Sequence, residues 1–148
     1  MKVRGFEVIS QFSNQEISLP VRATKQSAGY DISACEEYII EAGDTVLVKT
    51  GLKAYMLEDE VLQVYIRSSI ASKRGLILAN GVGIIDADYY NNPSNEGHIL
   101  IAIKNVGKET QIIHKNERIA QGIFMKYLLS DEDDVDHKTR TGGFGSSN

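Results

Sequence analysis

The sequence lacks several features by which classes of protein are recognised. It has one cysteine, Cys35, no tryptophan and only two prolines among 148 residues. A single cysteine excludes an intramolecular disulfide, so nothing in the chain indicates an oxidising compartment. No apolar run approaches the roughly 20 residues that span a bilayer, and the amino terminus lacks the apolar segment of a secretory signal. We therefore expect a cytoplasmic protein with no membrane partner.

An excess of basic residues is also absent. The 16 Lys and Arg residues are outnumbered by 20 Asp and Glu residues, which gives a formal net charge of −4. Binding along a nucleic acid needs a basic face that neutralises phosphates, so we expect no nucleic-acid partner. A small polyphosphate held by a few arginines remains compatible with this charge. The length and the 42% hydrophobic content fit one globular domain.

Long amphipathic helices are missing, and the hydrophobic pattern is mainly that of strands. One helical segment is expected at 68-SSIASKR-74, closed by Gly75. Many short strands separated by frequent turns predict an all-β sandwich or barrel. The strands that we predict from period-two alternation and short apolar runs cover 45–49, 61–67, 76–80, 98–104 and 119–127.

The carboxyl-terminal segment has a different composition. The acidic run 131-DEDDVD-136 leads into 137-HKTRTGGFGSSN-148, which is rich in glycine and serine. It has too few apolar groups to offset the entropy of ordering, so a frayed terminus is one interpretation. Arg140 and Phe144 support a second one, in which a guanidinium, a ring and free backbone N–H groups order around a ligand.

Asp86 and Asp88 are unusual because the apolar segment 83-GIID-86 runs directly into them. Carboxylates rarely enter a core unless they are paired, hydrogen-bonded or catalytic. A turn, a metal loop and a catalytic base are all compatible with this stretch. An EF-hand loop starting at Asp86 fails, because its fifth, sixth and twelfth positions hold tyrosine, asparagine and glycine.

Other common sites are excluded by counting. The G-x-G at Gly81 and Gly83 lacks its third glycine, and Gly107-Lys108 is followed by glutamate, so dinucleotide-binding and P-loop motifs are absent. Three histidines and the cysteine have no metal-ligand spacing, and we expect the histidines at the surface or at strand edges, without a directly bound transition metal. The histidines are His98, His114 and His137.

The stretch 67-RSSIASKRG-75 combines an arginine with two serines at the end of a predicted strand. Guanidinium and backbone N–H groups suit phosphate oxygens, so it is a candidate anion site. A helix N-cap serine beside a solvated arginine is the simpler alternative. Three further stretches carry glycine or arginine among polar residues: 27-SAGYDI-32, 117-ERIAQ-121 and the tail.

Taken together and in order, these stretches resemble the five motifs of the trimeric dUTP diphosphatase (dUTPase) family. The resemblance covers the chain from about Ala28 almost to its carboxyl terminus. The matching segments are 28-AGYDI-32, 67-RSSIA-71, 80-NGVGIIDADY-89, 117-ERIAQ-121 and 140-RTGGFGSS-147.

The resemblance implies a jelly-roll-like β-barrel that forms a homotrimer, with three active sites at the subunit interfaces, each completed by a neighbour's tail. It implies a barrel domain at 1–136 and a flexible glycine-rich lid at 137–148. The implied reaction is hydrolysis of dUTP to dUMP and pyrophosphate, with Asp86 as the general base for a water that attacks the α-phosphorus. Mg²⁺ on the triphosphate would be held mainly through waters, with Asp31 as an acceptor for one of them.

The family's binding residues carry over to matching positions of this sequence. Tyr89 would lie against the deoxyribose and leave no room for a 2′-hydroxyl, while Phe144 would stack on the uracil. The implied phosphate contacts are Arg67, Ser68, Ser69, Gln121, Arg140, Gly145, Ser146 and Ser147. The implied nucleoside contacts are Asn80, Gly83, Ile84, Ile85, Tyr89, Leu100 and Phe144.

Three positions depart from the family pattern. Ser69 replaces the usual glycine of the second motif, and the fifth motif is one residue shorter than usual between Arg140 and Phe144. The third motif continues into a longer loop, 90-YNNPSNEG-97, which we expect to be a surface extension near the site because its composition is that of turns.

Two alternative functions use the same fold. A dCTP deaminase-like enzyme would need a second arginine where Ser72 stands, and a glutamate on the strand after the third motif, where 98-HILIAIK-104 has no carboxylate. A noncatalytic dUTP-sensing module is the other alternative, and the presence of Asp86, Arg67 and Gln121 argues against it.

Overall fold

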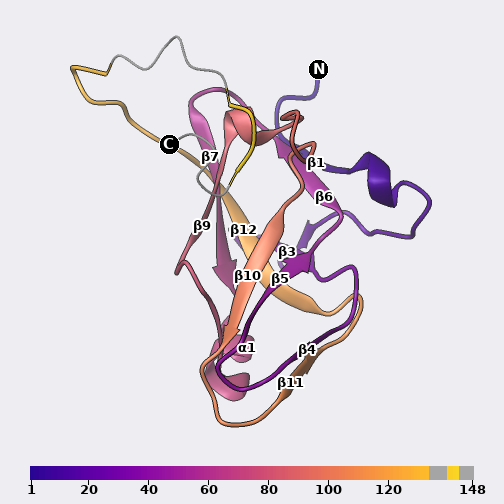
Figure 1. Cartoon of the computed structure of the whole chain (residues 1–148). Coiled ribbons are helices and arrows are strands. Elements are labelled where there is room, and N and C mark those ends of the chain that lie inside the picture. The colour runs from indigo at the N-terminus through magenta and orange to yellow at the C-terminus, as the bar shows by residue number, and fades with distance from the viewer. Residues whose placement is uncertain (134–139, 144–148) are drawn as a thin grey trace.

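The chain, in a computed structural model, is described at residues 1–133 and 140–143, and its regular elements are mainly short antiparallel strands (Figure 1). One α-helix and two 3₁₀ helices interrupt them. In chain order the elements are β1 (Gly5–Val8), η1 (Ser10–Phe12), β2 (Val21–Arg22), β3 (Tyr30–Ser33), β4 (Tyr38–Ile40), β5 (Thr45–Lys49), β6 (Leu52–Tyr55), β7 (Glu60–Ile66), α1 (Ser68–Arg74), β8 (Leu76–Leu78), β9 (Gly83–Asp86), η2 (Ala87–Tyr89), β10 (Leu100–Asn105), β11 (Gln111–Ile113) and β12 (Arg118–Lys126).

The largest sheet brings together strands that are distant in the sequence. Its order is β2-β3-β12-β7-β9, with antiparallel pairing throughout. A second sheet has the order β5-β10-β8, and two smaller ones pair β1 with β6 and β4 with β11. The strand-rich, single-domain architecture agrees with the predicted all-β barrel.

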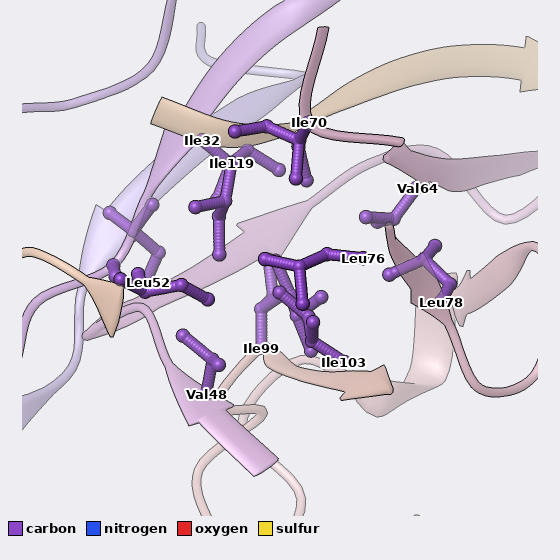
Figure 2. Packing of buried hydrophobic residues seen from close by; sticks show 14 of the residues in the cluster. Ile32, Val48, Leu52, Val64, Ile70, Leu76, Leu78, Ile99, Ile103 and Ile119 are labelled. Atoms are coloured by element: carbon purple, nitrogen blue, oxygen red, sulfur yellow. The ribbon is translucent and has the colours of Figure 1, made fainter. Parts of the chain in front are cut away.

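One hydrophobic core lies between the sheets. Figure 2 shows aliphatic side chains from both larger sheets and from α1 pointing toward one another. The fully buried members include Ile32 on β3, Leu62 on β7, Ile103 on β10 and Ile119 on β12. This aliphatic packing fixes the positions of the strand ends, where the polar residues of the motifs lie.

The predicted strands and the short helix are confirmed, with small shifts at their ends. Helix α1 ends at Arg74, and Gly75 follows in the left-handed conformation at φ 64° that closes a helix. The N-cap position is held by Arg67, which makes no side-chain cap bond. The simpler alternative, in which a serine caps the helix beside a solvated arginine, is therefore wrong.

His98 corrects one expectation, because this side chain is buried rather than at the surface. Its Nε2 accepts a hydrogen bond of 2.9 Å from the backbone N–H of Gly51, and its ring packs on Phe12. Burial, with a smaller contribution from Lys49, lowers the pKa of His98 to about 4. The imidazole is therefore neutral at physiological pH, with its proton on Nδ1.

Acid should destabilise the fold through His98. The unfolded chain takes up a proton near pH 6.5, whereas the folded chain does so only near pH 4. The contribution of neutral His98 to the free energy of unfolding is therefore complete above about pH 6.5. This contribution, about 3 kcal/mol, is lost as the pH falls toward 4. Urea unfolding across this range should show that loss in the wild type and a much flatter curve in His98→Gln. Parallel curves would contradict it.

No helix among residues 1–133 and 140–143 is long and apolar enough to cross a membrane. The expected division into a barrel at 1–136 and a lid at 137–148 falls partly within residues 134–139 and 144–148, which lie outside the described chain. That division stays a prediction.

Candidate active site

A pocket of about 250 Å³ opens beside the end of β9. Its walls come from the turn before β9, from β9 and η2, from the start of β10 and from the described part of the tail. The lining residues are Asn80, Val82, Gly83, Ile84, Ile85, Asp86, Tyr89, Leu100, Arg140 and Gly143. All of the predicted nucleoside contacts within the described residues line this pocket, and so does the predicted base.

Asp86 lies at the polar edge of the pocket, as the last residue of β9. Its side chain is 48% exposed, so a water can reach the carboxylate. Arg140 Nη2 lies 2.6 Å from Asp86 Oδ2, and Arg140 Nε lies 2.7 Å from Asp88 Oδ1. The structure thus places Arg140 beside the carboxylates of the third motif and gives Asp88 a contact that sequence reasoning had not assigned.

Tyr89 also lines the pocket and is 6% exposed. Its ring is closely covered by the tail, because a Cβ atom added at Gly143 would lie 2.7 Å from Tyr89 Cε1. Burial raises the pKa of the Tyr89 hydroxyl, which keeps it protonated as a hydrogen-bond donor.

A second group of predicted residues lies around Asp31 on β3. This carboxylate is 11% exposed, with Arg118 Nη1 at 3.3 Å and Arg67 Nε at 3.9 Å. Arg67 Nη1 also donates to the backbone carbonyl of Arg118. Sequence reasoning gave Arg118 no role, although its position inside the fourth motif was an available signal. Its contact with Asp31 depends on the pairing of β3 with β12.

Gln121 joins this group because it faces Asp31 directly across the β3–β12 pair. Its side chain lies over Gly29, where an added Cβ atom would come within 2.5 Å of Gln121 Oε1. Any larger residue at position 29 would displace the amide. Ser68 and Ser69 are exposed and form the first turn of α1, where helix N–H groups have no intrahelical acceptor.

The two groups lie at opposite ends of the large sheet. Asp86 pairs with Val61 at the start of β7, whereas Arg67 directly follows the end of the same strand. Arg67 lies six residue positions along the chain from Val61, which in a strand corresponds to roughly 20 Å. Figure 1 shows α1 at the lower end of the molecule and residues 140–143, in yellow, at the upper end.

The Arg67 side chain also turns toward β12 and β3, away from β9, as its contacts with Arg118 and Asp31 show. Within one chain, the predicted base therefore lies far from the predicted phosphate contacts Arg67, Ser68 and Gln121. The remaining predicted contacts Phe144, Gly145, Ser146 and Ser147 lie outside the described residues.

The residues around Asp31 suit a metal ion held through water better than one bound directly. Within residues 1–133 and 140–143, no group of three or more His, Cys, Asp or Glu side chains is arranged to hold a metal. Two guanidinium groups already offset the charge of Asp31. Its oxygens retain lone pairs that can accept from a metal-bound water, which is how Mg²⁺ usually meets protein carboxylates.

The fold and these two polar groups define a class of protein. It is a β-barrel with a nucleoside-sized pocket beside an accessible carboxylate, and with arginines and backbone donors suited to phosphates. Comparison with known proteins gives the family. The dUTPase family model matches residues 15–148, and the chain belongs to the dUTPase family.

Relatives cover nearly the whole chain. The deoxyuridine 5′-triphosphate nucleotidohydrolase of Lactococcus lactis is 51% identical over 99% of both chains. The protein of the same name from Acinetobacter baylyi is 36% identical over 98% of this chain and 97% of its own. The crystal structure of a dUTPase from Streptococcus mutans superimposes with a TM-score of 0.81 at 50% identity, covering 86% of this chain and 98% of that one.

Proposed function

We propose that this protein hydrolyses dUTP to dUMP and pyrophosphate. The observation that carries the proposal is the pocket beside β9, in which the predicted uracil and sugar contacts surround a cavity that ends at Asp86. A relative that is 51% identical over 99% of both chains is named for this reaction.

Asp86 is the general base. Its carboxylate is accessible at the end of a strand whose backbone is paired to β7, so it can hold a water in a fixed direction. Deprotonating that water while it attacks the α-phosphorus breaks the bond to the pyrophosphate leaving group. Arg140 is within hydrogen-bond reach of Asp86, and its guanidinium can exchange the carboxylates for phosphate oxygens when the nucleotide arrives.

The nucleoside is read by backbone and side-chain groups of the same pocket. The Asn80 amide offers one donor and one acceptor to a pyrimidine edge, and the backbone of Gly83 to Ile85 completes the contact. Tyr89 lies against the deoxyribose, and Leu100 closes the apolar side.

The triphosphate is held by the second group. Arg67, the backbone N–H groups of Ser68 and Ser69, and the Gln121 amide provide cations and donors for the charge that the phosphates carry. Bound Mg²⁺ would neutralise further charge on the phosphates. Asp31 is the residue that would hold it through water, and the same carboxylate keeps Arg67 oriented.

These two groups meet only between copies of the chain. Because Asp86 and Arg67 lie at opposite ends of β7, a common site requires that one subunit supply the pocket and a neighbour supply the phosphate contacts. Head-to-tail contacts of this kind form a ring where the rotation between subunits closes, and a homotrimer is the ring that we propose.

The glycine-rich segment 137–148 acts as a lid. Its segment 140–143 already covers the pocket at Tyr89. A chain that ends after Arg140 should keep its fold and oligomeric state but lose turnover by at least about tenfold, since an open site positions and desolvates the phosphates poorly. Pyrophosphate release and sedimentation check this, with Phe144→Ala in the full-length chain as a milder variant. Full activity of the shortened chain would remove the lid.

Parallel assays of pyrophosphate release from dUTP, dCTP, dTTP and UTP, with and without Mg²⁺, test the proposal. We expect Mg²⁺-stimulated release from dUTP alone. Deamination of dCTP is measured beside it, although β10 (Leu100–Asn105) has no carboxylate for such chemistry. Binding of dUTP without cleavage would replace hydrolysis with a sensing function.

A further inference from the structure

The loop 90–97 is a packed part of the site rather than a simple surface extension. It begins directly after Tyr89 and returns to it, because Asn95 Nδ2 donates a hydrogen bond of 2.8 Å to the Tyr89 hydroxyl. The hydroxyl in turn donates to the backbone carbonyl of His98 at 2.7 Å. Both hydrogen-bonding capacities of this buried hydroxyl are thereby used.

The direction of the Asn95 amide is fixed by its own contacts. Asn95 Oδ1 accepts from Asn92 Nδ2 at 2.8 Å and from the Gly97 N–H at 3.1 Å. If the amide were flipped, its NH₂ group would face two other donors, Asn92 Nδ2 and the Gly97 N–H. Nδ2 must therefore face Tyr89. Asn92 is buried, and it closes the loop by donating to the Tyr89 carbonyl and accepting from the N–H groups of Ser94 and Asn95.

The loop is also anchored to the barrel behind it. Lys53 on β6 is almost buried, and its Nζ donates to Glu96 Oε2 at 2.7 Å and to Asn91 Oδ1 at 2.6 Å. Glu96 accepts from the Ser10 backbone N–H as well. At Gly97 the φ is 91°, and an added Cβ atom would lie 2.8 Å from the Tyr89 carbonyl oxygen. The loop therefore cannot shift without moving Tyr89.

From these contacts we propose that Asn95 is a positioning residue for sugar selection. The loop 90–97 holds the Tyr89 ring against the deoxyribose face, so that the ring cannot move away from a 2′-hydroxyl; this role rests on the proposed function. An aromatic ring that excludes one added oxygen atom by steric contact must be held rigidly. If the ring could move aside, the apolar pocket would discriminate poorly against a hydroxyl. Two hydrogen bonds on one hydroxyl, with the loop anchored at Lys53, provide that rigidity.

The test compares binding of dUMP with binding of UMP, together with kcat/KM for dUTP and UTP. Asn95→Asp keeps the acceptor for Gly97 and removes the donor to Tyr89. We expect the preference for the deoxy nucleotide to fall about tenfold, mainly through tighter binding of UMP, with kcat for dUTP nearly unchanged. Ser94→Ala, in the same loop, is the matched control, because only its backbone is used.

Tyr89→Phe supplies the second arm, since it removes the hydroxyl and keeps the ring. Asn95→Asp should add no further loss of selectivity in that background. Unchanged selectivity in Asn95→Asp, or an equal loss for both sugars, would overturn the inference. Binding preference for dUMP without cleavage of dUTP would instead contradict the proposed hydrolysis and leave the Asn95 result to be judged on binding alone.

Discussion

Asp86→Asn should lose between about 10² and 10⁴ in turnover while its affinity for dUTP stays close to that of the wild type. The amide has the shape of the carboxylate and can contact Arg140, but it cannot take a proton from the attacking water. The effect should therefore fall on kcat, measured as pyrophosphate release at saturating dUTP, and leave the dissociation constant for the nucleotide nearly unchanged.

Asp88→Asn is the matched control for that variant. Asp88 also contacts Arg140, through Nε rather than Nη2. Asp88→Asn loses only the ion pair with Arg140, so its turnover should fall only modestly. The large loss of turnover should occur only in Asp86→Asn, which also loses the base. Turnover near the wild-type value in Asp86→Asn would remove this carboxylate from the mechanism.

Arg67→Ala should lower kcat/KM for dUTP by roughly 10²- to 10³-fold, because a positioned cation for the transition-state charge is lost. Arg67→Lys should recover only part of this, since an ammonium cannot make the two parallel contacts of a guanidinium. In Arg67→Ala the carboxylate of Asp31 would still contact Arg118 and so keep one of its two cations.

Lys73→Ala removes the same charge from the exposed side of α1 and serves as the control for Arg67. It should retain nearly full activity if the position of the charge matters and not its sign alone. Equal losses in Lys73→Ala and Arg67→Ala would mean that the general field of the surface, rather than a contact at Arg67, attracts the nucleotide.

Five of the twelve strands in the described residues, together with α1, could be predicted from local pattern. The alternation of 98-HILIAIK-104 gave a strand with Ile99, Ile101 and Ile103 buried together, and Gly75 marked the end of α1. The pattern was wrong for His98, which a strict alternation sets on the outer face. The strand begins only at Leu100, and the return of the loop 90–97 turns the imidazole inward instead.

The division of the site into two groups could not be predicted from motif order. Asp31, Arg67, Asp86 and Gln121 follow one another in the chain, but the sheet order β2-β3-β12-β7-β9 sets three of them at one end and Asp86 at the other. Register decides this, and register depends on pairings between residues far apart in sequence.

The support of Tyr89 was equally hidden from sequence. The composition of 90-YNNPSNEG-97 indicated turns, and it is a compact turn. Its anchor is Lys53, which lies 43 residues from Glu96 along the chain. No local pattern links a lysine on β6 to a tyrosine wall of the pocket, so only the folded contacts reveal the connection.

The central claim is that dUTP is cleaved where the pocket of one copy meets the phosphate contacts of another. Asp86→Asn and Arg67→Ala chains should each be nearly inactive when pure. Mixed in equal amounts and allowed to exchange subunits, they should recover roughly a quarter of wild-type pyrophosphate release, because random assembly joins an intact pocket to an intact Arg67 at that frequency. A mixture no more active than its separate components, while wild-type chains treated alike stay active, would contradict the account.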